Sequence, residues 1–276
     1  MAVDLHIHSA ASDGSLSPEA IVDEAKGLGL AAIAIADHDA MTGVEPARRR
    51  GETVALPVIP AVEISTDYEE TEVHILGYWV DPNDPQLEGQ LSYIRDGRLL
   101  RARRMVERLR QLKLKIELDD VLREAHGASV GRPHVAAALV RAGACATPRE
   151  AFDRYIGKSG PAYVPRVRPS VVEAVRIVAR AGGCPVLAHP GLVFGHPRIV
   201  QDVARLGARG VEAYHPKHTP GAVETLVRVA RSLGLLVTGG SDSHGEAGSD
   251  PTPIGAGNVP DSCAAELEEW QRARDA

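Results

Sequence analysis

Short apolar segments recur along this chain, and each one leads into histidine or acidic residues. Residues 31–36 form a continuous apolar run that ends at Asp37, His38 and Asp39. Similar segments occur at 57–62 before Glu63, at 72–78 around His74, at 185–188 before His189, at 210–214 before His215 and at 235–240 before Asp242 and His244. Continuous apolar runs are typical of strands that are buried on both faces of a parallel sheet.

Helical spacing of apolar residues separates these strands, most clearly at 170–182, 197–207 and 219–233. A chain of about seven short strands that alternate with helices predicts a barrel-like α/β fold. In such folds the carboxyl ends of the strands meet at one face. We therefore expect the polar residues that follow the strands to form a site on that face.

The first strand carries a candidate metal site of its own. His6 and His8 lie on one face of an alternating segment, whereas Leu5 and Ile7 lie on the other, and Asp13 follows closely. Two imidazoles and a carboxylate are suitable ligands for a divalent transition metal. A histidine pair is weak support by itself, so the prediction depends on the similar residues at the later strand ends.

Residues 85–160 interrupt the alternation, because they have helical patterns and no clear strand. We predict that 1–84 and 161–276 form the barrel and that 85–160 is an inserted helical subdomain that caps the site. Its first helix, over 86–112, carries seven arginines, which raises the possibility of RNA binding. No aromatic residues for base stacking are interleaved with these arginines, so a solvent-exposed arginine face is the preferred interpretation.

Composition excludes several classes of protein. A chain of 276 residues is long enough for one large α/β domain with an insertion. Its formal charge of −6 argues against non-specific coating of nucleic acid, although not against a local basic groove. The three cysteines form no C-x-x-C pair, and no secretory signal or long apolar span is present. We therefore expect a cytoplasmic protein with no membrane contact and no obligate protein partner.

Seven segments resemble, in order, the motifs of the PHP (polymerase and histidinol phosphatase) superfamily of metal-dependent phosphoesterases. They are DLHIHSAASDGS, IADHD, AVEIS, EVHILGY, LAHPG, EAYHPKH and GGSDSHG. The resemblance covers nearly the whole chain and implies a distorted (β/α)7 barrel that binds three divalent ions. It implies that the first ion is held by His6, His8, Glu63 and Asp242, the second by Asp13, His38 and His244, and the third by Glu63, His74 and His189.

Nitrogen and oxygen ligands without cysteine suit manganese, iron or zinc. Some relatives have a histidine in place of Asp13, and an oxygen ligand there favours manganese or iron over zinc. Close relatives often have an aromatic residue at the position of Ser243. We expect the serine of this chain to alter the packing of the substrate and to leave metal binding intact. Asp37 and Asp39 flank His38. We expect one of these carboxylates to orient the metal ligands without binding an ion itself, and the other to be exposed to solvent.

Three further segments, GRPH at 131–134, YIGKSGPAYVP at 155–165 and PIG at 253–255, are similar to a subgroup that acts on nucleotides. This resemblance implies that Arg132, His134 and Lys158 contact phosphate; a solvated basic surface is the alternative. His215 and His218 are candidates for a leaving-group acid or for substrate contacts, and a purely structural role is an equal alternative. We assign catalytic roles to His215, Arg132 and Lys158, and substrate binding to these residues together with His134 and His218.

Clustered divalent ions suit hydrolysis at phosphorus, because they make hydroxide available near neutral pH and neutralise charge in the transition state. We expect this hydroxide to attack directly, without a phosphoenzyme. The preferred substrate is the 3′-phosphate of a small nucleoside 3′,5′-bisphosphate. Alternatives are 5′-3′ cleavage of short RNA, cyclic-phosphate hydrolysis, histidinol-phosphate hydrolysis and a non-catalytic module like those fused to some polymerases. The complete ligand set and the lack of a polymerase segment argue against the last.

Overall fold

The computed structural model describes residues 2–69, 71–125, 129–165, 168–193, 195–245 and 251–275. The chain forms two compact units, one made of 1–90 and 169–276 and the other of 91–168. The division of the chain into domains with boundaries at 84 and 160 stays a prediction. None of the described helices is long and apolar enough to cross a membrane.

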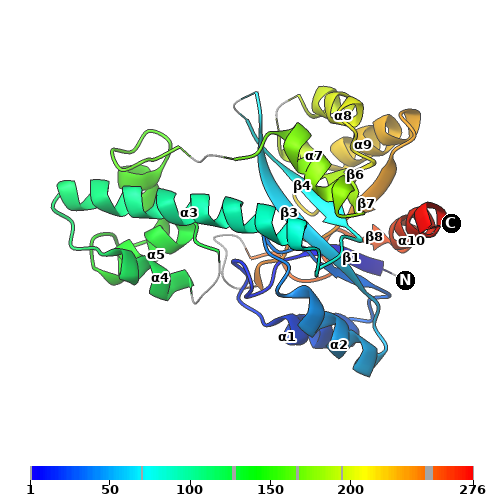
Figure 1. The fold of residues 1–276 in the computed structure, drawn as a ribbon, viewed down its shortest axis with the longest axis horizontal. Coiled ribbons are helices and arrows are strands. Elements are labelled where there is room, and N and C mark those ends of the chain that lie inside the picture. Colours follow the sequence, from blue (N-terminus) through cyan, green and yellow to red (C-terminus); the bar gives the residue numbers. More distant parts are fainter. Residues whose placement is uncertain are drawn as a thin grey trace. The chain divides into compact units, whose positions relative to one another are not determined.

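The first unit is built on a single eight-stranded sheet (Figure 1). Along the chain its strands are β1 (Ala2–Ile7), β2 (Ile33–Ile35), β3 (Val58–Tyr68), β4 (Thr71–Tyr78), β5 (Cys184–Leu187), β6 (Gly210–Tyr214), β7 (Leu236–Gly239) and β8 (Val259–Pro260). Their order in the sheet is β7-β6-β5-β4-β3-β2-β1-β8. The segment after β7 returns to β1, where Ser243 bridges Ile7, so the sheet is a nearly closed barrel. The predicted α/β barrel is confirmed.

The strands β1, β2 and β3 pair in parallel with one another, as do β5, β6 and β7. Two strands run the other way: β4 pairs antiparallel with β3 on one side and with β5 on the other, and the short β8 pairs antiparallel with β1. The expectation that each strand is followed by a helix is therefore wrong at β3, because β3 pairs directly with β4. The paired residues run from Ala61 opposite Tyr78 to Tyr68 opposite Thr71. Because this pairing continues past Glu63, β3 is longer than the sequence predicts.

Helices of the first unit pack on the outside of the sheet (Figure 1). They are α1 (Pro18–Gly27), α2 (Val44–Val54), α7 (Val171–Arg180), α8 (His196–Arg205), α9 (Pro220–Ser232) and α10 (Ser262–Asp275). Several begin where the sequence indicates: Ser17 caps α1, Thr219 caps α9, and Ser170 forms a capping box with Glu173 at α7. These side chains accept hydrogen bonds from amides that the first helical turn leaves unpaired.

The second unit has a hydrophobic core of its own. It contains most of α3 (Pro85–Gln111), together with α4 (Leu118–Ala125), α5 (Arg132–Arg141), α6 (Pro148–Ala151) and the π-helix η1 (Phe152–Ile156). Met105, Leu109, Leu139 and Ile156 are among its buried residues. Its described residues include no strand, as the sequence predicts.

Four of the seven arginines of α3 are exposed, as the sequence predicts, but Arg98 and Arg101 are not. Arg98 is 9% exposed, and Arg101 donates a hydrogen bond of 2.8 Å from Nε to the Val164 carbonyl. The Arg101 guanidinium also lies over the Tyr163 ring. The prediction of a solvent-exposed arginine face is therefore wrong for these two residues, because Arg98 is nearly buried and the Arg101 guanidinium contacts a backbone carbonyl and an aromatic ring of the same unit.

A tyrosine crosses the interior of the barrel. Tyr78, at the end of β4, is 0% exposed, and its hydroxyl donates a hydrogen bond of 2.9 Å to the Leu5 carbonyl of β1. These strands are not neighbours in the sheet. The bond therefore links opposite walls next to His6.

Replacing Tyr78 by Phe should lower the free energy of unfolding by about 1–2 kcal/mol, because water cannot replace the buried hydrogen bond. Urea denaturation of the metal-free chain measures this change. The matched control is Tyr93→Phe, which removes a hydroxyl from a residue that is 71% exposed. This control should change stability by less than about 0.5 kcal/mol. Equal effects of the two substitutions would contradict the cross-barrel role of Tyr78.

Candidate metal centre

The structure brings all nine sequence-predicted metal ligands together at one end of the barrel. They come from β1 and the segment after it (His6, His8, Asp13), from the end of β2 (His38), from β3 and β4 (Glu63, His74), from the end of β5 (His189) and from the segment after β7 (Asp242, His244). The parallel strands deliver their residues at their carboxyl ends. Because β4 runs the other way, His74 near its beginning reaches the same place.

Glu63 lies at the centre of the cluster and is 1% exposed. Its Oε1 lies 2.8 Å from His74 Nδ1, 3.1 Å from His189 Nε2 and 3.5 Å from His6 Nε2, and its Oε2 lies 2.9 Å from His38 Nδ1 and 3.4 Å from His8 Nε2. The register explains the first contact. Glu63 pairs with Leu76, so His74 is its diagonal neighbour on the same face of the hairpin.

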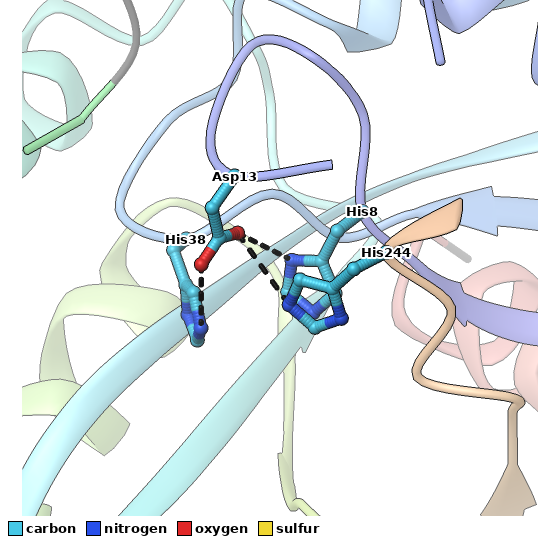
Figure 2. A group of neighbouring side chains, drawn as sticks. All are labelled: His8, Asp13, His38 and His244. Carbon is cyan, nitrogen blue, oxygen red and sulfur yellow. Dashed lines mark ion pairs between the residues drawn. The ribbon is translucent and has the colours of Figure 1, made fainter. Parts of the chain in front are cut away.

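A second group of side chains surrounds Asp13 (Figure 2). Asp13 Oδ1 lies 3.5 Å from His244 Nε2 and 3.8 Å from His8 Nδ1, whereas Oδ2 lies 4.0 Å from His38 Nε2. Figure 2 shows the carboxylate between the His38 ring on one side and the stacked His8 and His244 rings on the other. One ligand atom from each of the four residues lies within 4.8 Å of the others.

Two further groups share members with the first. His6, His8 and Glu63 form one, and His38, Glu63 and His74 form the other. Asp242 Oδ1 lies 3.2 Å from His8 Nε2 and so joins the same region. Because His8, His38 and Glu63 each belong to two groups, the allotment of ligands to individual ions stays a prediction.

The donor set fits a divalent cation. Among the residues that the structure describes, His8 Nδ1 and Glu63 Oε2 are buried atoms without a hydrogen bond. In addition, His6 Nε2 and His8 Nε2 face each other at 3.1 Å. Buried polar atoms that make no hydrogen bond cost free energy, and a cation would satisfy their lone pairs.

Electrostatics keep Glu63 and His8 in the forms that bind metals. Burial raises the pKa of Glu63, but His74, His38 and His6 outweigh burial and hold the pKa well below its usual range. Burial lowers the pKa of His8, and the neighbouring His244 adds to this effect, so the pKa falls to about 4. At neutral pH the central carboxylate is therefore charged and the His8 ring is neutral.

The backbone is strained at two of the proposed ligands, His189 and Asp242, and at Asp39, which follows the ligand His38. His189, Asp242 and Asp39 have positive φ angles of 27°, 53° and 52°. Residues other than glycine rarely adopt this region, and such strain is concentrated at functional sites. Each of these residues lies just after a strand of the barrel.

Buried carboxylates hold the loops that carry the ligands. Asp37 accepts hydrogen bonds from Ser9 N at 2.7 Å, from Ser9 Oγ at 2.7 Å and from Ser12 Oγ at 2.6 Å. Asp39 is also 0% exposed and accepts a bond from Ser65 N at 3.4 Å. The expectation that one of these two carboxylates is solvated is therefore wrong, because the loop after β1 binds Asp37 and the strand β3 binds Asp39.

Sequence reasoning missed two acidic residues, Asp4 and Glu212, both of which are 0% exposed. Asp4 accepts hydrogen bonds of 2.8 Å from Ser241 N and from Gly255 N. Glu212 lies 3.0 Å from His6 Nδ1. The available signal was an acidic residue inside an otherwise apolar strand, where burial of a charge requires hydrogen-bond partners.

His215 and His218 are both buried, and their ring nitrogens differ in availability. His215 Nδ1 accepts a bond from Lys217 N at 3.1 Å, and Nε2 lies 3.5 Å from Asp242 Oδ2. His218 Nδ1 donates to the Ala213 carbonyl at 2.8 Å, and its Nε2 accepts from Gly191 N at 3.1 Å. Both nitrogens of His218 are therefore bonded to backbone, which favours the structural alternative for this residue.

The three residues expected to contact phosphate lie in the second unit. Arg132 begins α5, and its guanidinium lies 5.4 Å from the centroid of the Phe152 ring. His134 Nδ1 accepts a hydrogen bond of 2.9 Å from Gly131 N. Lys158 is exposed just after η1. The substrate contacts of these residues stay predictions.

The tight loop that carries Asp13 depends on Gly14. A Cβ at this position would lie 2.3 Å from the His8 carbonyl oxygen and 2.7 Å from the carbonyl carbon. We expect Gly14→Ala to lower the free energy of unfolding by about 1–3 kcal/mol, because the loop must move. The control is Gly27→Ala at the end of α1, where a Cβ meets nothing within 4 Å. Urea denaturation should find this control neutral or stabilised by up to about 1 kcal/mol, and an equal loss in both would contradict the crowding.

Comparison with known proteins supports the interpretation of this centre. Residues 4–78 match the PHP domain. The chain is 34% identical over 255 residues to a 3′,5′-nucleoside bisphosphate phosphatase from Chromobacterium violaceum, and the match covers 90% of each chain. It is also 34% identical over 247 residues to a 5′-3′ exoribonuclease from Escherichia coli, covering 87% of this chain and 84% of the relative.

Solved structures agree with these matches. A protein from Bifidobacterium adolescentis, assigned as a metal-dependent phosphoesterase, has a TM-score of 0.86 at 35% identity, covering 96% of this chain and 94% of its own. An amidohydrolase structure from Chromobacterium violaceum, with bound sulfate and no metal, has a TM-score of 0.81 at 30% identity, covering 99% and 97%. Relatives this similar over nearly their whole length confirm the resemblance seen in the motifs, and the chain belongs to the PHP domain family.

Proposed function

We propose that this protein is a metal-dependent hydrolase of phosphate esters whose substrate is a small nucleotide. The observation that carries this proposal is the convergence of five histidines, from four strands or the segments just after them, on the buried carboxylate of Glu63. Relatives that cover nearly the whole chain are named for a bisphosphate phosphatase and an exoribonuclease, which both act on phosphate esters of nucleotides. The preferred substrate is the 3′-phosphate of a nucleoside 3′,5′-bisphosphate.

The nine clustered side chains would hold three divalent ions. Their nitrogen and oxygen donors suit manganese, iron or zinc. Ions bound here would lower the pKa of water and supply positive charge for the phosphoryl oxygens. The role of the chain is to fix the positions of these charges before the substrate arrives. Each electrostatic contact with the charge of the transition state typically raises the reaction rate about 10²–10³-fold.

His215 is suited to act on a substrate oxygen. Because the Lys217 amide donates to Nδ1, the neutral ring carries its proton on Nε2, the nitrogen that faces Asp242. We assign this Nε2–H as a donor to the leaving group or to a phosphoryl oxygen. Arg132 and Lys158 are assigned as phosphate contacts, with His134 beside them, because Arg can bind phosphate through two nitrogens and Lys adds a point charge.

Short RNA and cyclic phosphates are alternative substrates. The exoribonuclease from Escherichia coli supports the first, and a phosphoribosyl 1,2-cyclic phosphate 1,2-diphosphodiesterase from Eggerthella lenta, 30% identical over 260 residues, supports the second. Both reactions need the same charges around phosphorus, so substrate shape distinguishes them rather than the metal centre.

Protein purified without chelator should contain transition metal and should release phosphate from adenosine 3′,5′-bisphosphate. Dialysis against chelator should remove the metal and the activity together, and manganese should restore both. Parallel assays with a 5′-phosphorylated oligoribonucleotide and with a cyclic nucleotide identify the preferred ester. A metal-loaded chain that hydrolyses none of these esters would contradict the proposed function.

The double substitution of Asp13 and His38 by Ala should lower the rate of phosphate release by at least about 10²-fold, because two ligands of one ion are lost. Metal analysis should find about one ion fewer per chain. Asp23→Ala, which removes an exposed carboxylate paired with Arg50, is the control and should retain full activity. Unchanged activity of the double variant would exclude this part of the cluster from catalysis.

A further inference from the structure

Glu212 is a buried carboxylate to which the proposed ligand set and substrate contacts give no role. It lies in β6 and is 0% exposed. Its Oε1 lies 3.0 Å from His6 Nδ1, and its Oε2 accepts a hydrogen bond of 2.8 Å from His189 N. Each carboxylate oxygen therefore contacts a different proposed metal ligand.

These two ligands come from separate parts of the barrel. His6 belongs to β1, whereas His189 follows β5, and β6 lies next to β5 in the sheet. The sheet nearly closes where the segment after β7 meets β1, so β7 lies between β6 and β1. Glu212 thus reaches past one strand to His6 while it holds the backbone of His189 on the other side.

The contact with His6 decides which ring nitrogen is offered to an ion. An ionised carboxylate only accepts hydrogen bonds, so His6 Nδ1 carries the proton that points at Glu212. The remaining nitrogen, Nε2, faces the centre and lies 3.1 Å from His8 Nε2, 3.5 Å from Glu63 Oε1 and 3.7 Å from Asp242 Oδ1. An ion held there would bind the lone pair of Nε2 in place of any proton, and the Nδ1–H bond to Glu212 would remain.

We infer that Glu212 is a positioning residue of the metal centre, which fixes the nitrogen that His6 offers and the backbone from which His189 projects. It contacts neither an ion nor the substrate itself. This inference rests on the proposed metal-dependent function. It adds a residue that supports two predicted ion sites at once, since His6 belongs to the first set and His189 to the third.

The substitution Glu212→Gln tests this role with little change of shape. An amide has one acceptor and one donor group, so it cannot accept from both His6 Nδ1–H and His189 N–H. One of these donors must lose its partner, or His6 must turn its proton toward the centre. Each outcome weakens metal binding, and loss of such outer hydrogen bonds typically lowers metal affinity about 10–100-fold.

Thr238→Val is the matched control. Thr238 is the Cα partner of Glu212 on β7 and is 0% exposed, and it is not one of the nine proposed ligands. The experiment loads full-length wild-type and variant chains with manganese and measures the metal that each retains across a chelator series. We expect Glu212→Gln to release metal at about 10–100-fold lower chelator concentration than the wild type, and Thr238→Val to match the wild type.

Hydrolysis provides a second measurement, because a defect of affinity should be reversed by excess manganese. Glu212→Gln should regain most of its activity there, and its thermal midpoint in chelator should equal that of the wild type. Metal retention equal to the wild type would overturn the inference. So would an equal fall of the thermal midpoint with and without metal, because Glu212 would then support the fold rather than the ligands. A wild-type chain that takes up no metal would instead contradict the proposed function.

Discussion

The centre of this protein depends on one buried carboxylate surrounded by histidines. Glu63 is almost inaccessible, and both of its oxygens lie within hydrogen-bonding or ion-pair distance of imidazole nitrogens. A lone charge in such a place would be expensive, because the low dielectric of the interior penalises it. The histidines compensate for this cost, and their positions in turn require strands from opposite parts of the sheet to end at the same point.

The barrel supplies that convergence through its topology. Parallel strands bring their carboxyl ends to one face, and the reversed strand β4 brings His74 to the same face from its opposite end. Around the ligands lies a further layer of buried acids, in which Asp37 holds the loop after β1 and Glu212 joins His6 to His189. Positive φ angles at His189 and Asp242 indicate that the chain accepts local strain to place these side chains.

Much of the candidate site could be predicted from local sequence. Alternation places His6 and His8 on one face, and apolar runs that end at His38, His189 and Asp242 indicate strands with functional carboxyl ends. The order of these motifs indicated the family. Local patterns were less informative for Glu63, because its strand continues beyond it as part of a hairpin with β4, and this pairing is not a property of either segment alone.

The sequence by itself determined which donors are available: histidine and carboxylate groups without cysteine, spaced so that strands carry them to one face. Only the tertiary structure decided how the donors are shared and what supports them. Glu63 contacts rings from distant strands, both nitrogens of His218 are bonded to backbone, and Glu212 reaches past β7 to His6. The physical reason is that such hydrogen bonds and buried charges depend on strand register and barrel closure, which arise from contacts between residues far apart in the chain.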